Sequence, residues 1–236
     1  MTLTPIATNL WTTAQPLRFL GLEVGARMTV VRLSSGELVL ISPVSLPESL
    51  CSSLDELGTV AHIIAPNLFH HLFVGQTQAR YPQAQAWGVE GLRDKRPDLK
   101  IDALLNQAGT FSGELDYLPF AGFEVILPRG IATVNETVFF HRPSHTLILT
   151  DIAFNFDSSS SLGTQLAARV LGSYDKLKPT LLEKWGTRDK SKVETSVQQV
   201  MAWDFERVVP AHGSVIDVGG KAAFQAGYEW FLNRSL

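Results

Sequence analysis

Short apolar runs rich in β-branched residues recur along the chain and alternate with stretches of helical spacing. The first two runs, Thr29–Leu33 and Leu38–Ile41, flank Ser34-Ser35-Gly36-Glu37, and strand-forming residues on both sides of turn-forming residues are typical of a β-hairpin. Helical spacing follows over Leu46–Leu57, with Pro47 near the start, where a missing N–H costs least. Strands that alternate with covering helices predict an α/β architecture built in layers.

The same periodicities indicate the remaining elements. Strands are expected at 60–64, 84–88, 115–118, 123–127, 137–141, 146–150 and 208–209, and helices at 76–79, 91–101, 162–171, 180–184, 193–203 and 222–232. The four serines at 158–161 are typical of a mobile loop. No internal repeat and no linker interrupts this order, so residues 1–236 are expected to form a single domain.

The composition argues against several classes of protein. Charged residues make up 18% of the chain and the net charge is -3, which gives no reason to expect nucleic-acid binding. No apolar run approaches the roughly 20 residues of a membrane span, and the stretch Met1–Pro5 lacks the features of a signal peptide. Cys51 is the only cysteine, which excludes an intramolecular disulfide and a cysteine-based zinc site. We therefore expect a soluble cytoplasmic protein.

Potential metal ligands follow three of the expected strands. His70 and His71 come after the strand at 60–64, Asp151 ends the apolar run 147–150, and His212 lies in the block Pro210-Ala211-His212-Gly213. Histidine is the commonest metal ligand and titrates near neutral pH. Nitrogen and oxygen ligands from three strand ends suit zinc, iron or manganese. The three strand ends together therefore indicate a candidate metal site.

Each of these residues also has a purely structural interpretation. Side chains of adjacent strand residues point to opposite faces, so His70 and His71 can share a metal only where the strand has ended, and Pro66 and Asn67 supply such a break. Alternatively, a helix starts here, with one histidine at its cap and the other half exposed. Asp151 could equally cap a helix, and a lone histidine such as His212 is more often structural.

Other polar residues stand close to these strand ends. Residues that could line the same site are Asn67, Asn135, Glu136 and Asn155. The chain contains no phosphate-binding glycine loop, no Gly-x-Ser-x-Gly nucleophile elbow and no dinucleotide fingerprint. The sequence names no catalytic residue.

The order of these blocks resembles that of the metallo-β-lactamase superfamily over most of the chain. That family has a four-layered αβ/βα sandwich with its metal site at one edge of the two sheets. Its hallmark is a strand followed by His-x-His-x-Asp-His, with later ligands at the end of a strand and in a Pro-Gly-His-Gly-like turn. The run Leu147–Asp151 is similar to the aspartate block, and Val208–Gly213 is similar to the last histidine block.

The hallmark itself is altered in this chain. Pro66 and Leu68 stand where the resemblance places its first two histidines, His70 where it places the aspartate, and His71 where it places the last histidine. The middle histidine block falls near 132–137, where no histidine occurs. The resemblance therefore implies that the first metal site is absent. It also implies one remaining metal, zinc in the first place and iron or manganese as alternatives, with the ligands His70, His71, Asp151 and His212.

Two functions follow from this resemblance. One is a mononuclear metal-dependent hydrolase of a small molecule whose identity the sequence does not give. Four protein ligands would fill a tetrahedral shell, so a hydrolase needs a fifth position or a loose ligand. The other is a catalytically degenerate member that binds a ligand or a protein, with a structural metal or none. An unrelated α/β protein with incidental histidines is a third interpretation. The segment 157–205 is expected to form a lid or a surface that pairs two copies as a homodimer.

Overall fold

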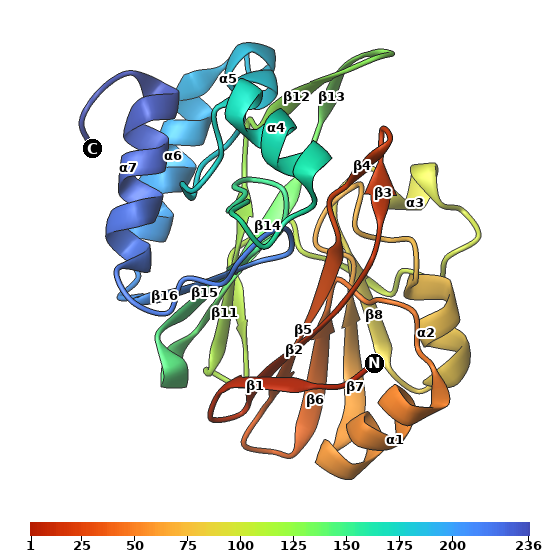
Figure 1. Ribbon diagram of the computed structural model, residues 1–236. Coiled ribbons are helices and arrows are strands. Elements are labelled where there is room, and N and C mark those ends of the chain that lie inside the picture. The colour runs from red at the N-terminus through yellow and green to blue at the C-terminus, as the bar shows by residue number, and fades with distance from the viewer.

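Two β-sheets face each other in this computed structural model, which describes all residues 1–236, and helices cover the outer face of each sheet (Figure 1). The order of layers is helix, sheet, sheet, helix. This is the four-layered αβ/βα sandwich that the family resemblance implies. None of the helices has the length and apolar character that a membrane crossing requires.

The first sheet contains seven strands in the order β1-β2-β5-β6-β7-β8-β9. The strands on one side of it pair antiparallel, whereas β6, β7, β8 and β9 run parallel. Its elements are β1 (Thr4–Ala7), β2 (Leu10–Gln15), β5 (Ala26–Arg32), β6 (Glu37–Ile41), β7 (Thr59–Ile64), β8 (Gln85–Gly88), β9 (Ala103–Leu104), and the covering helices α1 (Glu48–Leu57), α2 (Val74–Arg80) and α3 (Leu92–Lys95).

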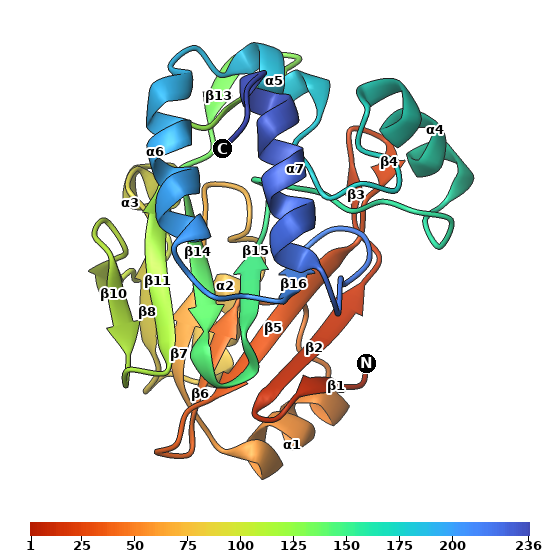
Figure 2. The same ribbon diagram turned by 90° about the vertical axis from the view of Figure 1, so that its left-hand side faces the viewer.

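The second sheet contains five strands in the order β10-β11-β14-β15-β16, of which only β15 and β16 pair parallel. The long helices α6 and α7 cover its outer face (Figure 2). Its elements are β10 (Gly109–Phe111), β11 (Leu115–Phe120), β14 (Glu136–His141), a 3₁₀ turn (Arg142–Ser144), β15 (Thr146–Leu149), α6 (Lys190–Met201), β16 (Arg207–Pro210) and α7 (Gly220–Leu232).

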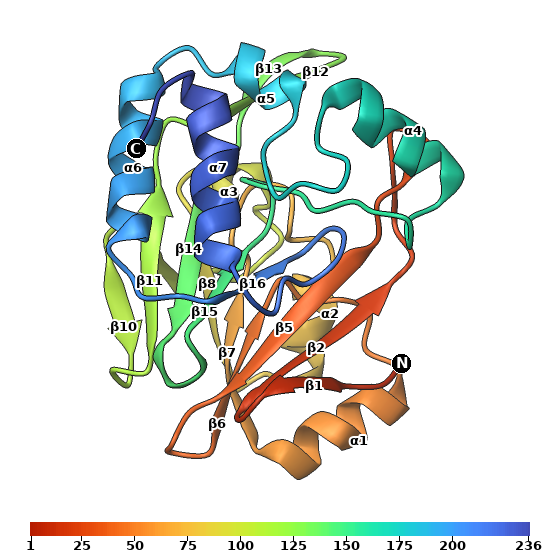
Figure 3. The same cartoon turned by 60° about the vertical axis from the view of Figure 1, so that its left-hand side comes forward.

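Smaller elements gather at one end of the sandwich (Figure 3). They form two short ribbons and two helices, and helix α4 lies against the ribbon of β3 and β4. These elements are β3 (Arg18–Phe19), β4 (Leu22–Glu23), β12 (Glu124–Leu127), β13 (Gly130–Thr133), α4 (Leu162–Leu171) and α5 (Leu181–Gly186).

Apolar side chains from both sheets meet in the middle layer. Val31 and Ile64 of the first sheet and Phe139, Ile148 and Val209 of the second belong to one buried cluster. Burying a side chain of this kind contributes roughly 1.5–3 kcal/mol. This layer holds the sheets face to face. It brings the carboxyl ends of the strands β7, β15 and β16 to the same edge of the sandwich.

The sequence predicts most of the regular elements correctly and misses several short ones. The hairpin of β5 and β6 and the helices α1, α4 and α7 are confirmed. The strands within 4–23 and the strands β9, β10 and β13 were not predicted. They have two to six residues and too little apolar alternation to give a period.

Candidate metal centre

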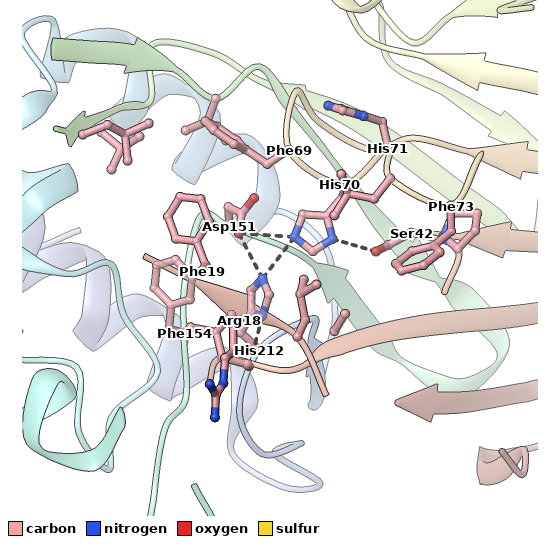
Figure 4. A pocket seen from close by; sticks show the side chains of 18 of the residues that line it. Arg18, Phe19, Ser42, Phe69, His70, His71, Phe73, Asp151, Phe154 and His212 are labelled. Carbon is pink, nitrogen blue, oxygen red and sulfur yellow. Dashed lines mark hydrogen bonds and ion pairs between the residues drawn. The ribbon is translucent and has the colours of Figure 1, made fainter. Parts of the chain in front are cut away.

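Three ligand atoms converge at the edge where the sheets meet, and their residues, His70, Asp151 and His212, are called the ligand triad below (Figure 4). Nε2 of His70 lies 3.1 Å from Nε2 of His212. Oδ1 of Asp151 lies 3.3 Å from each of these nitrogens. Each residue follows a different strand, β7, β15 or β16.

The spacing of these three atoms fits a single divalent metal. Ligand atoms at about 2.0–2.1 Å from zinc in a tetrahedron lie about 3.3 Å from one another. Nδ1 of His212 faces the carbonyl oxygen of Val24 at 3.3 Å, and a carbonyl only accepts, so Nδ1 carries a hydrogen and Nε2 is the nitrogen that can bind a metal. Nε2 faces a carboxylate oxygen of Asp151, an arrangement that a shared cation would stabilise.

His70 is aimed into the triad by Asn67 and Ser42. Oδ1 of Asn67 accepts hydrogen bonds from the backbone N–H groups of Phe69 and His70, both at 2.8 Å, and this closes the turn after β7. On the far side of the imidazole, Oγ of Ser42 lies 2.6 Å from Nδ1 of His70. A partner on the second ring nitrogen fixes the orientation of a ligating histidine.

Asp151 is held by two buried polar side chains. Nδ2 of Asn67 donates to Oδ2 of Asp151 at 2.7 Å. Glu136 accepts from the backbone N–H groups of Thr150 at 2.7 Å and Asp151 at 2.6 Å. Burial and the Asp151 charge raise the pKa of Glu136 to about 7, while these hydrogen bonds oppose the rise. Burial would likewise raise the pKa of Asp151, but His70 and His212 outweigh it and hold that pKa well below its usual range.

His212 sits in a turn that tolerates only glycine after it. Gly213 has a φ of +85°, and a Cβ there would lie 2.1 Å from the carbonyl oxygen of Asn155. Arg27 of β5 clamps the same turn, since its guanidinium donates to the carbonyl oxygens of Pro210 and Gly213. Asn155 adds a hydrogen bond from Nδ2 to the carbonyl of Ser214 at 2.9 Å.

His71 does not join the ligand triad, so the expected set of four ligands is reduced to three. Its Nδ1 lies 2.8 Å from Nη1 of Arg96, and Figure 4 shows its ring directed away from the three ligand atoms. Burial lowers the pKa of His71 to about 4, and the charges of Lys95 and Arg96 add to this. The chain turns after β7, so neighbouring side chains diverge, and the contact with Arg96 fixes the direction of His71.

A cavity of about 390 Å³ opens onto the ligand triad. Apolar side chains dominate its walls, and its charged lining residues outside the triad are Arg18, Lys95 and Glu183. The ribbon of β3 and β4 forms one wall through Arg18 and Phe19. The apolar lining residues are Leu17, Phe19, Val24, Ala26, Pro43, Phe69, Leu72, Phe73, Val125, Leu127, Val134 and Phe154.

The polar residues expected to line the site lie behind it instead. Asn67, Glu136 and Asn155 support the triad from outside the cavity wall. Asn135 is not brought to the triad: its Nδ2 donates to the carbonyl of Glu90 at 3.1 Å. Their positions correct the expectation of a polar lining, because each side chain is used by a hydrogen bond within the protein.

Sequence reasoning missed three residues of this site. Ser42 follows the strand β6 directly, the signal that marked Asp151, and could have been found in that way. Glu183 lies in Thr180-x-x-Glu183, a pattern typical of a helix cap. Arg27 lies inside a strand and gives no signal, since its partners are 183 and 186 residues away.

Solved structures with the metallo-β-lactamase fold are similar to this protein over nearly its whole length. The metallo-beta-lactamase from Pontibacter korlensis has a TM-score of 0.65 at 13% identity and covers 99% of each chain. The metallo-beta-lactamase FIM-1 from Pseudomonas aeruginosa, in its mono-zinc form, has a TM-score of 0.61 at 11% identity and covers 98% of this chain and 95% of its own. This protein therefore has the metallo-β-lactamase fold.

A third similar structure and the sequence comparisons complete this picture. The Flv1 flavodiiron core from Synechocystis sp. PCC6803 has a TM-score of 0.64 at 12% identity and covers 98% of this chain and 60% of its own. No curated protein matches the chain in sequence. The family described as "Domain of unknown function (DUF4336)" matches residues 7–176, a range that includes His70 and Asp151 and ends before His212.

Proposed function

Because the chain belongs to the DUF4336 family and has the metallo-β-lactamase fold, we propose that it is a mononuclear metal-dependent hydrolase. The observation that carries the proposal is the ligand triad, in which three ligand atoms lie 3.1–3.3 Å apart beside a cavity. A bound divalent metal supplies Lewis acidity, which polarises a carbonyl or phosphoryl oxygen and makes water nucleophilic near neutral pH.

The position of His71 favours a catalytic over a structural metal. Structural zinc sites are closed by four protein ligands, whereas catalytic sites use three and leave a position open. Here His71 faces Arg96, and the cavity lies next to the remaining three ligands. The same arrangement removes the difficulty that four ligands would fill a tetrahedral shell.

We propose zinc as the resident metal, with iron(II) and manganese(II) as alternatives. Two histidines and one carboxylate suit zinc, and the same donor set also holds non-haem iron(II). Metal analysis of protein purified without chelator distinguishes them, and the proposal expects about one metal per chain. A protein that stays metal-free after incubation with each of the three metals would contradict the proposal.

The cavity walls favour a substrate with an apolar part. Phe19, Phe69 and Phe154 lie around the triad and make this part of the cavity wall apolar. Lys95 is engaged by the carbonyl of Leu68 and by the ring of Phe69, so it is poorly available to a phosphate group. Arg18 is then the one lining cation that could face a phosphate, in a wall that is otherwise mostly apolar. We therefore propose that carboxylic esters with an apolar acyl or aryl group are hydrolysed, and phosphodiesters less well.

The direct experiment compares metal-loaded and metal-free protein on an ester and a phosphodiester series. Metal-loaded protein is expected to hydrolyse aryl esters, the chelated protein is not, and Asp151→Asn should behave like the chelated protein. Hydrolysis that survives chelation would contradict the proposal. A metal-loaded wild type that binds apolar esters without cleaving them would instead identify the second candidate, a degenerate ligand-binding module with the same cavity.

A further inference from the structure

Glu183 is a buried carboxyl group in the wall of the cavity that holds the ligand triad. It lies in the first turn of α5, its exposed fraction is 5%, and it lines the same cavity as His70 and His212. A buried glutamate normally needs a paired cation or hydrogen bonds to its oxygens. The neighbours of Glu183 therefore decide whether its carboxyl group is ionised or protonated.

The helix cap uses only one of the two oxygens. Oε2 of Glu183 accepts from the backbone N–H of Thr180 at 2.7 Å and from the Thr180 hydroxyl. No residue donates a hydrogen bond to Oε1. This oxygen is also absent from the set of buried side-chain atoms without a partner, so it is not fully buried. The capping box thus holds the carboxyl in place and leaves Oε1 free at the cavity wall.

No cation pairs with Glu183. Helix α5 packs on β12, whose Val125 and Leu127 are apolar. The nearest lysine in sequence, Lys184, donates to the carbonyl of Trp230 and to Asn233. The ionisable groups on other elements that interact electrostatically with Glu183 are the Asp151 carboxylate and the buried Tyr228 hydroxyl, which donates to the carbonyl of Ile152.

These surroundings favour the protonated carboxyl. Burial raises the pKa of Glu183 to about 7; the hydrogen bonds from Thr180 oppose this, and the Asp151 charge adds a small further rise. A group with a pKa near the working pH is suited to donate and take back protons. Asp151 and Glu183 are the only acidic residues of the cavity wall, and Asp151 belongs to the ligand triad.

We propose that Glu183 is the general acid and base of this cavity, an inference that rests on the proposed hydrolase function. The oxygen of the attacking water forms a bond to the acyl carbon, and the bond from that carbon to the leaving oxygen breaks, with its electron pair going to the leaving oxygen. Oε1 of Glu183 gives its proton to that oxygen and releases the alcohol. The proton lost by the attacking water returns to the Glu183 carboxylate, which restores the acid.

The test uses Glu183→Gln and a matched variant, Thr180→Val, in the metal-loaded protein. Glutamine keeps an oxygen for the Thr180 N–H but has no acidic proton, whereas Thr180→Val weakens the cap and keeps the carboxyl. An alkyl leaving group needs protonation and p-nitrophenolate does not. We therefore expect Glu183→Gln to lower kcat/KM about 100-fold on an alkyl ester and less than about 5-fold on a p-nitrophenyl ester. Thr180→Val should lower both equally.

A second readout separates acid catalysis from a structural role. The kcat/KM of the wild type on the alkyl ester should fall as pH rises through about 7, and this fall should be absent in Glu183→Gln. Equal losses on both esters, or an unchanged pH profile, would overturn the role of Glu183 while the wild-type activity leaves the hydrolase proposal standing. A metal-loaded wild type inactive on every ester overturns both.

Discussion

His70 and His71 are neighbours in the chain but lie in opposite electrostatic environments. His70 faces the Asp151 carboxylate and a second imidazole. His71 faces the Arg96 guanidinium, which in turn pairs with Asp98 at 2.6 Å; His71, Arg96 and Asp98 are called the arginine cluster below. The turn after β7 therefore directs His70 toward a potential metal site and His71 toward a permanent cation, the Arg96 guanidinium.

The difference between the two environments explains why only one histidine can serve as a ligand. Guanidinium groups donate hydrogen bonds and stay charged, so Nδ1 of His71 is already an acceptor for Arg96. A second cation beside Arg96 and Lys95 would be repelled. In the ligand triad the Asp151 carboxylate attracts a cation.

Removal of one triad ligand is expected to have the largest effect. His212→Ala or Asp151→Asn leaves two ligand atoms, and the metal affinity should fall more than about 100-fold, beyond the 10–100-fold typical of outer-shell partners. Competition with a chromophoric chelator measures this. An affinity within tenfold of the wild type in either variant would show that the triad is not the metal site.

Substitution of Asn67, which holds two triad residues in place, is expected to have the second-largest effect on metal affinity. Asn67→Ala removes the donor to Asp151 and the acceptor for the His70 N–H, so metal affinity should fall about 10–100-fold. The matched variant Asn67→Asp keeps the acceptor but sets a second carboxylate against Asp151. If Asn67 holds the triad in its binding geometry, both variants bind metal more weakly than the wild type. A wild-type affinity in Asn67→Ala would show that Asn67 does not position the triad.

The arginine cluster should affect stability rather than metal binding. His71 is neutral when folded, because its pKa is lowered from 6.5 to about 4, so the unfolded state binds more protons between these values. Its contribution is therefore present above pH 6.5 and is lost as pH falls toward 4. Between pH 7 and pH 4.5, the free energy of unfolding of His71→Gln should fall less than that of the wild type, by up to roughly 2 kcal/mol. Urea unfolding of both proteins at pH 7 and pH 4.5 gives the difference, and parallel losses would contradict the assignment.

The layers of the fold could be predicted from periodicity because long elements carry enough apolar repeats. Strand β7 and the hairpin of β5 and β6 bury apolar runs, and helix α1 buries one face. The two-residue strands β3 and β4 contain no such repeat. Their ribbon nevertheless forms a wall of the cavity, so a region that shapes the cavity is one that the sequence did not predict.

The sequence predicted the three ligand residues of the candidate site but not the partners that orient the histidines. Strand ends marked His70, Asp151 and His212, which the structure brings together. The direction of His71 depends on Arg96, 25 residues away, and the aim of His70 depends on Ser42, 28 residues away. Such partners meet only after the sheets have packed, and a local pattern contains no information about them.

The most direct test of the account is metal binding by His70→Ala and His71→Ala measured side by side. The two variants remove the same side chain from adjacent positions, so general effects of the substitution are matched. The account predicts that His70→Ala loses more than about 100-fold in zinc affinity and that His71→Ala stays within about threefold of the wild type and keeps about one metal per chain. Equal losses in the two variants, or a larger loss in His71→Ala, would contradict a three-ligand metal centre.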